Sequence, residues 1–160
     1  MISSPAQVRT AGMNAPSFMD LALRAAENAA SAGEVPVGCV LVRGGEVIAT
    51  AANCTVTDRD PTAHAEILAI RQAAKHVGSE RLVDCDLYVT LEPCTMCAGA
   101  ISLARIRRLY YGAADPKGGA VDSGVRFFAQ PTCHHTPEVY PAIGERAAAT
   151  LLREFFKARR

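Results

Sequence analysis

The chain has 160 residues, of which 49% are hydrophobic and 21% are charged, and its formal net charge at pH 7 is +1. This composition is that of an ordinary globular protein, and it excludes a collagen-like or an intrinsically disordered chain. The length predicts one domain, residues 1–160, which can bury a hydrophobic core without disulfide bonds. Because the net charge is close to zero, a nucleic-acid partner would have to be bound through a local basic patch.

Residues 1–14 are small and polar without periodicity, and we expect them to form a disordered tail. The chain shows no apolar run typical of a secretory signal or of a membrane span. We therefore expect a cytoplasmic protein without a membrane partner. In that reducing compartment cysteines are expected as thiols or metal ligands rather than as disulfides. The six cysteines are Cys39, Cys54, Cys85, Cys94, Cys97 and Cys133.

The first half of the chain is predicted to form a helix followed by two strands. Ser17 and Asp20 form a capping-box pattern, so a helix is predicted from Ser17 until Gly33. Two runs rich in β-branched residues follow at about 37–43 and 46–52. The two glycines between these runs are typical of the tight turn in an antiparallel hairpin.

The second half predicts helices alternating with strands. Pro61 and Thr62 are expected to open a second helix that reaches about His76. The remaining predicted elements are a strand at 86–92, a helix at 94–104, a strand at 107–112, a short helical piece at 127–128, an edge strand near 139 and a helix at 145–158. This alternation indicates an α/β fold whose sheet begins with an antiparallel hairpin and continues in parallel.

Three side chains have the spacing of a metal site. Cys94 and Cys97 are three positions apart at the start of a predicted helix, which places their Cβ atoms about 5–6 Å from each other. His64 lies at the start of the preceding helix, and helix N-termini in an α/β fold meet at one edge of the sheet. One imidazole and two thiolates suit Zn²⁺ and would leave its fourth position to water, as in catalytic sites. The partial positive charge of helix N-termini also favours thiolates.

Glu66 is the candidate proton shuttle for a water at this site. One geometric difficulty concerns its neighbour His64, because residues two apart on an ideal helix point about 200° away from each other. Both side chains can reach one water only if they lie in the first turn of the helix.

Two other interpretations of the cysteine pair remain open. A redox Cys-x-x-Cys would leave His64 and Glu66 without a role. A structural zinc site would need a fourth ligand, which Cys133, His134 or His135 could supply. The other three cysteines, Cys39, Cys54 and Cys85, are interpreted as small core residues.

The motif resembles a known family. His64-Ala65-Glu66, followed by the segment PCTMC at 93–97, is similar to the H-x-E and P-C-x-x-C signature of the zinc deaminases. The resemblance is strongest to the bacterial tRNA-specific adenosine deaminases of the cytidine/deoxycytidylate deaminase superfamily. It extends over EVPVG at 34–38, Asn53, DPTAHAE at 60–66, LYVTLEPCTMCAGA at 87–100, DPKGGA at 115–120 and the C-terminal LREFFKARR.

The resemblance implies a three-layer α/β/α cytidine-deaminase-like fold with a mixed five-stranded sheet. It implies one Zn²⁺ per subunit on His64, Cys94 and Cys97, proton transfer by Glu66 and substrate binding by Asn53. Read from the residues alone, Asn53 could also be a turn residue that closes the second strand. The implied reaction is hydrolytic deamination of adenosine to inosine at the wobble position of a tRNA anticodon.

The implied partners are a tRNA anticodon stem-loop and a second copy of the chain, with no DNA. The alternative is a deaminase of a free base or nucleoside such as guanine, cytosine or cytidine. A noncatalytic RNA-binding module is a third hypothesis, against which Glu66 argues, because binding alone needs no proton shuttle.

Two basic clusters are compatible with RNA binding. One is Arg105, Arg107 and Arg108, and the other lies at 153–160 with Phe155 and Phe156 interleaved. Basic side chains hold phosphates and aromatic rings stack on unpaired bases. Equally, basic residues are common at helix C-termini and the two phenylalanines could lie in the core or in a subunit interface.

Overall fold

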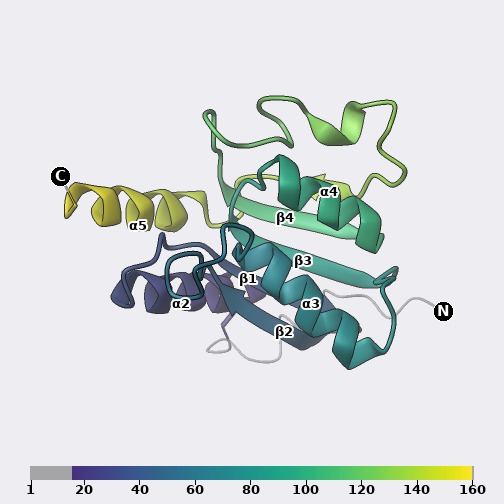
Figure 1. Cartoon of the computed structure of the whole chain (residues 1–160), viewed down its shortest axis with the longest axis horizontal. Coiled ribbons are helices and arrows are strands. Elements are labelled where there is room, and N and C mark those ends of the chain that lie inside the picture. The colour runs from purple at the N-terminus through teal and green to yellow at the C-terminus, as the bar shows by residue number, and fades with distance from the viewer. Residues whose placement is uncertain (1–15, 160) are drawn as a thin grey trace.

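The computed structural model describes residues 16–159, so the predicted tail at 1–14 lies outside the described residues. A five-stranded mixed sheet forms the centre of the molecule, with strand order β2-β1-β3-β4-β5 (Figure 1). The strands are β1 (Gly38–Arg43), β2 (Glu46–Ala52), β3 (Cys85–Leu91), β4 (Arg108–Ala113) and β5 (Glu138–Tyr140). The helices are α2 (Phe18–Ser31), α3 (Ala65–Val77), α4 (Thr95–Ala104) and α5 (Glu145–Lys157), with a short 3₁₀ helix η1 (Phe127–Ala129).

The sheet combines antiparallel and parallel pairs. β1 pairs antiparallel with both β2 and β3, whereas β3, β4 and β5 run parallel to one another. The predicted antiparallel first hairpin and mixed five-stranded sheet are therefore confirmed. The parallel part begins at β3, whose carboxyl end meets that of β4 at one edge of the sheet.

Helices cover both faces of the sheet, which gives the three predicted layers (Figure 1). Successive side chains of β1 point to opposite faces of the sheet, so this strand contributes to the core on both sides. Cys39 and Leu41 pack in the cluster that includes α3 and α4. Val40 and Val42 pack in the cluster that includes α2. Gly38 sits where α2 crosses β1, because a Cβ atom there would lie 1.9 Å from the carbonyl oxygen of Ala22.

The second helix begins later than the sequence predicted. Thr62 donates from its backbone N–H and its hydroxyl to Oδ1 of Asp60, at 2.8 and 2.7 Å, and this side-chain turn holds the backbone outside the helix. α3 therefore starts at Ala65, and the expected start at Pro61 and Thr62 is wrong. The capping box of Ser17 and Asp20 is present as predicted at the start of α2.

No helix within residues 16–159 is long and apolar enough to span a membrane.

Candidate active site

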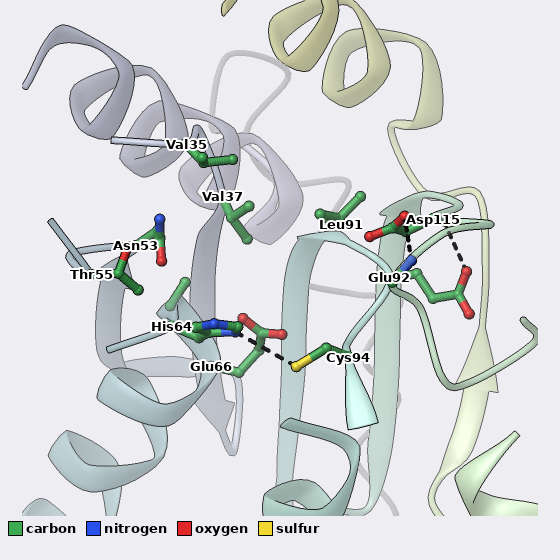
Figure 2. A pocket seen from close by; sticks show the side chains of 12 residues that line it. Val35, Val37, Asn53, Thr55, His64, Glu66, Leu91, Glu92, Cys94 and Asp115 are labelled. Atoms are coloured by element: carbon green, nitrogen blue, oxygen red, sulfur yellow. Dashed lines mark hydrogen bonds between the residues drawn. The ribbon is translucent and has the colours of Figure 1, made fainter. Parts of the chain in front are cut away.

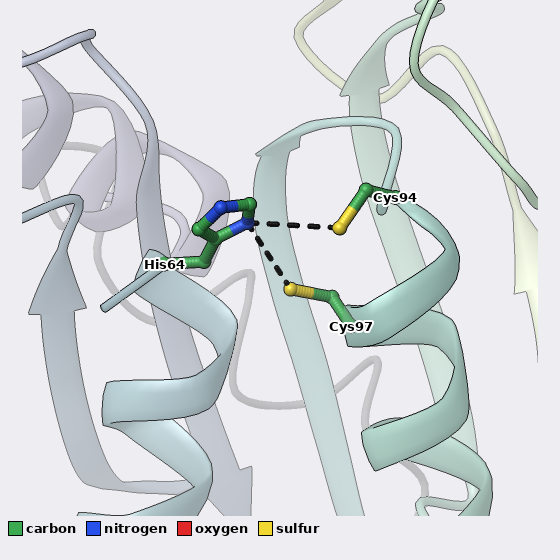
Figure 3. Close-up of side chains that lie close together, drawn as sticks. All are labelled: His64, Cys94 and Cys97. Carbon is green, nitrogen blue, oxygen red and sulfur yellow. Dashed lines mark hydrogen bonds between the residues drawn. The ribbon is translucent and has the colours of Figure 1, made fainter. Parts of the chain in front are cut away.

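The structure brings His64, Cys94 and Cys97 together at the edge of the sheet (Figure 3). Nδ1 of His64 lies 3.6 Å from Sγ of Cys94 and 3.5 Å from Sγ of Cys97. A tetrahedral Zn²⁺ with bonds of about 2.0 Å to nitrogen and 2.3 Å to sulfur would hold such atoms about 3.5 Å apart. The three ligand atoms thus fit one zinc ion, and their role as ligands stays a prediction.

Two helix N-termini position these side chains. His64 is the N-cap residue of α3 and Cys94 is the N-cap residue of α4, both with extended backbone angles, while Cys97 lies in the first turn of α4. The late start of α3 removes the geometric difficulty raised by the sequence. Because His64 precedes the helix and Glu66 is its second residue, their side chains are not fixed at the angle of an ideal helix.

The cysteine pair favours one thiolate even without an ion. The pKa of Cys94 is lowered to about 5, chiefly because the Cys97 thiol donates a hydrogen bond to its sulfur. The backbone N–H groups of Cys97 and Met96 and the nearby His64 lower this pKa further, whereas burial raises it. The same hydrogen bond, together with burial and the neighbouring Glu66, raises the pKa of Cys97. A metal ion would be needed to stabilise the second thiolate.

Glu66 lies next to the three predicted ligands and is only 4% exposed. Burial raises the pKa of its carboxyl group, although a hydrogen bond from its own backbone N–H and one with the Cys97 thiol oppose the shift. A buried carboxyl group beside a metal position can exchange a proton with a bound reactant, which is the chemistry expected of a general acid and base.

A pocket of about 360 Å³ opens above these residues, within the range of small-molecule sites (Figure 2). Its floor includes His64, Glu66 and Cys94. Asn53 lies on one side of the pocket, directly after β2 and 8% exposed, so it both closes the strand and lines the cavity. The far side is formed by Leu91, Glu92, Asp115 and Gly118.

Two buried carboxylates beside the pocket were missed by the sequence interpretation. Glu34 is 2% exposed and accepts hydrogen bonds from the backbone N–H groups of Val56 and Thr57 and from the Thr57 hydroxyl. Burial raises the pKa of Glu34, but these hydrogen bonds outweigh it and hold the pKa below its usual value. Glu92, also 2% exposed, holds a loop on the other side of the pocket.

The sequence around both glutamates contains features that could have marked them as functional, but these features are not specific. Each lies inside a segment that resembles the family, EVPVG or LEPC, and each is a charged residue beside an otherwise apolar run. Charged residues at such positions are almost never fully buried unless paired, so only the folded loops reveal what they bind.

The remaining candidate ligands lie elsewhere. Nε2 of His135 is 2.7 Å from the carbonyl oxygen of Ile106, Sγ of Cys133 is 3.1 Å from the carbonyl oxygen of His135, and His134 is exposed. Among residues 16–159, the only group of three or more side chains placed to hold a metal ion is the one described above. The other three cysteines are free thiols: Cys39 and Cys85 are buried, and Cys54 is partly buried.

The first basic cluster has structural partners. Arg107 makes a two-point ion pair with Asp86, at 3.0 Å for each bond, and Arg108 pairs with Glu138 at 3.0 Å. These residues lie at the start of β3, β4 and β5, whereas the pocket lies at the carboxyl ends of β3 and β4. The cluster is therefore remote from the candidate site.

The second cluster is divided between core and surface. Phe155 is 7% exposed and Phe156 is 48% exposed. The guanidinium of Arg159 lies 3.5 Å from the centre of the Phe155 ring. Only the exposed Phe156 among these two rings remains available to a partner.

The fold and the site match a family of known enzymes. Residues 13–113 match the model of the cytidine and deoxycytidylate deaminase zinc-binding region, which spans His64, Glu66, Cys94 and Cys97. The chain therefore belongs to the zinc-binding deaminase family.

Curated relatives show which zinc-binding deaminases this chain resembles. The chain is 62% identical over 143 residues to the tRNA-specific adenosine deaminase of Agrobacterium fabrum, covering 89% of this chain and 94% of the relative. It is 46% identical to the tRNA-specific adenosine deaminase of Haemophilus influenzae over 144 residues, covering 89% of this chain and 83% of the relative. The predicted resemblance to bacterial tRNA-specific adenosine deaminases is thus confirmed.

Solved structures agree with this placement. A structure from a study of A-to-I editing by tRNA:A34 deaminases is 63% identical and superimposes with a TM-score of 0.83, covering 84% of this chain and 98% of the other. The guanine deaminase of Bacillus subtilis is 36% identical with a TM-score of 0.61, covering 92% of this chain and 94% of the other. The predicted cytidine-deaminase-like fold is confirmed.

Proposed function

We propose that this protein hydrolytically deaminates adenosine to inosine at the wobble position of a tRNA anticodon. The observation that carries the proposal is a pocket floored by His64, Glu66 and Cys94, in a chain 62% identical to a tRNA-specific adenosine deaminase. Residues 1–160 would act as a single deaminase domain.

One zinc ion per chain is proposed on Nδ1 of His64 and the sulfur atoms of Cys94 and Cys97. The donor set suits Zn²⁺, because two thiolates and an imidazole are the ligand types that it prefers, and their spacing matches a tetrahedral edge. When bound, zinc would polarise water and increase its acidity.

Glu66 would move the protons of the reaction. Water adds to C6 of the adenine, the bond between C6 and the exocyclic nitrogen breaks, and ammonia leaves. Glu66 would take one proton from the attacking water and pass it to the ring nitrogen, and would then take the second proton from the new hydroxyl at C6 and pass it to the departing amine. Its placement beside Cys97 at the floor of the pocket supports this role.

Asn53 would bind the target nucleoside. Its position on the side wall of the pocket supports this role, because an amide can both donate and accept hydrogen bonds with a base or sugar. Thr55, on the same wall, offers a further polar group.

The test is to incubate the zinc-loaded protein with an anticodon stem-loop that carries adenosine at the wobble position, and to digest the product to nucleosides. Inosine should appear, and a stem-loop with guanosine at that position should stay unchanged. The alternative function is deamination of a free base or nucleoside, which the similarity to a guanine deaminase also supports. It is tested by incubating the protein with guanine, cytosine and cytidine and assaying for ammonia. Ammonia from the free bases without inosine from the RNA would contradict the proposal.

We also propose that the protein is a cytoplasmic homodimer that binds the RNA and not DNA. Large apolar side chains are exposed on α4, with Met96 at 36% and Leu103 at 70% exposure. These residues are seven positions apart and so share one face of the helix, which supports a contact with a second copy. Light scattering that finds only monomer at micromolar concentration would contradict the dimer.

A further inference from the structure

The carboxylate of Glu92, just after β3, is surrounded by hydrogen-bond donors from one loop. Oε2 accepts from the backbone N–H groups of Val121, Asp122 and Ser123, at 3.1, 3.0 and 3.0 Å. Oε1 accepts from the backbone N–H of Asp115 and from the Ser123 hydroxyl, each at 3.0 Å. Within residues 16–159 no ion pair involves Glu92, so loop donors, not a cation, stabilise its charge.

These donors belong to both ends of the loop 115–123. The loop forms one wall of the pocket through Asp115 and Gly118, beside Glu92 itself (Figure 2). Because Glu92 binds both ends of the loop, its side chain fixes the position of this pocket wall.

The loop is fixed to the segment that carries a predicted metal ligand. The backbone N–H of Ala120 donates to the carbonyl oxygen of Pro93 at 2.9 Å, and Gly119 forms a bridge with Cys94. Glu92 therefore lies at the junction between the pocket wall and the metal position, only two residues before Cys94.

Gly119 shows how closely the loop approaches the carboxylate. A Cβ atom at this position would lie 2.5 Å from Cδ of Glu92 and 2.6 Å from the carbonyl oxygen of Asp115. Atoms at such distances overlap, so a side chain would displace the loop or the glutamate. The absence of a side chain at 119 is an independent sign that the contact is built tightly.

A carboxylate suits this position better than other side chains. Its two oxygens act only as acceptors, with about four acceptor sites, whereas all five converging groups are donors that need an acceptor. Glutamine has almost the same shape, but its amide nitrogen would face backbone N–H groups that need an acceptor. A buried donor left without a partner costs about 1–3 kcal/mol, so the loop would move to recover one.

We propose that Glu92 is a positioning residue for the substrate: it holds the loop 115–123 at the place where Asp115 and Gly118 contact the target nucleotide. This inference rests on the proposed function, because it takes the pocket as the nucleotide site. Glu92 acts through the loop and does not touch the reacting atoms, since its oxygens are already occupied by loop donors.

The test compares Glu92→Gln with the unaltered protein and with Glu80→Gln, the same chemical change at a side chain that is 86% exposed. Steady-state deamination of the anticodon stem-loop should show KM raised at least about tenfold in Glu92→Gln, with kcat lowered less, because misplaced binding groups weaken substrate binding. Bound zinc should be unchanged, and backbone amides at 115–123 should exchange hydrogen faster. Glu80→Gln should match the unaltered protein in all three measurements.

Ser123→Ala provides a milder variant in case Glu92→Gln does not fold. It removes only the hydroxyl that donates to Oε1 of Glu92, and should raise KM about fivefold, in keeping with one lost hydrogen bond. An unchanged KM in the folded variants overturns the inference, as does loss of zinc from Glu92→Gln, which would place the residue in support of the metal. If the unaltered protein forms no inosine, the proposed function fails instead, and hydrogen exchange still reports whether Glu92 holds the loop.

Discussion

Replacing Glu66 with glutamine should remove proton transfer while leaving zinc binding and the shape of the site unchanged. The side chain is 4% exposed, so a replacement must keep its volume, and glutamine does so while losing the ability to exchange a proton at neutral pH. His64, Cys94 and Cys97 are untouched, and zinc binding should therefore remain.

The size of the effect follows from the position of Glu66. It is the carboxyl group placed on the pocket floor with the predicted ligands, whereas Glu92 is occupied by its loop. A positioned general acid or base contributes typically 10²- to 10⁴-fold in rate, so the barrier should rise by roughly 3–5 kcal/mol. Because this interaction acts in the transition state, kcat and kcat/KM should fall by similar factors.

The assay is single-turnover formation of inosine on the stem-loop, with bound zinc measured on the same samples. Glu80→Gln is the matched control, since that exposed side chain lies outside the pocket. A Glu66→Gln variant that holds zinc and retains turnover within about tenfold of the unaltered protein would refute the assigned role.

Three further predictions concern the metal and the fold. Cys97→Ser should lose most bound zinc in elemental analysis, because a serine oxygen is a harder and weaker ligand than thiolate, whereas Cys133→Ser should keep it. Gly38→Ala should destabilise the fold by about 1–3 kcal/mol in denaturant unfolding, because the new Cβ would lie 1.9 Å from a backbone oxygen of α2. Gly99→Ala is its control, since a Cβ there meets only one atom within 4 Å, at 3.9 Å, and alanine favours the helix. Glu34→Gln should reduce the free energy of unfolding most at neutral pH. Since the folded pKa of Glu34 is lowered, its stabilisation is present above the unfolded value of about 4.3 and is lost as pH falls through the lower folded pKa.

Each of these predictions has a contrary result. Zinc retained in full by Cys97→Ser would remove this residue from the metal site. Equal stabilities for Gly38→Ala and Gly99→Ala would mean that the helix can move away from β1 freely. A stability difference between Glu34→Gln and the unaltered protein that stays constant between pH 7 and about pH 3 would show that the charge of Glu34 is not what holds its loop.

The sequence by itself determined the elements and the identity of the metal-ligand candidates. Hydrophobic periodicity and capping patterns depend on neighbours within a few residues, so the hairpin, the helices and the Ser17 cap could be predicted. The motif around His64, Glu66, Cys94 and Cys97 was visible for the same reason, because each half lies within one short segment.

Only the tertiary structure decided how those halves meet and what surrounds them. The side-chain turn at Asp60 moved the start of α3, and so placed His64 ahead of the helix with Glu66 in its first turn. Arg107 and Arg108 proved to be ion-paired at the far edge of the sheet. Glu92 gathers donors from up to 31 residues away in the chain. Such contacts follow from the packing of distant segments, which local patterns of residues do not encode.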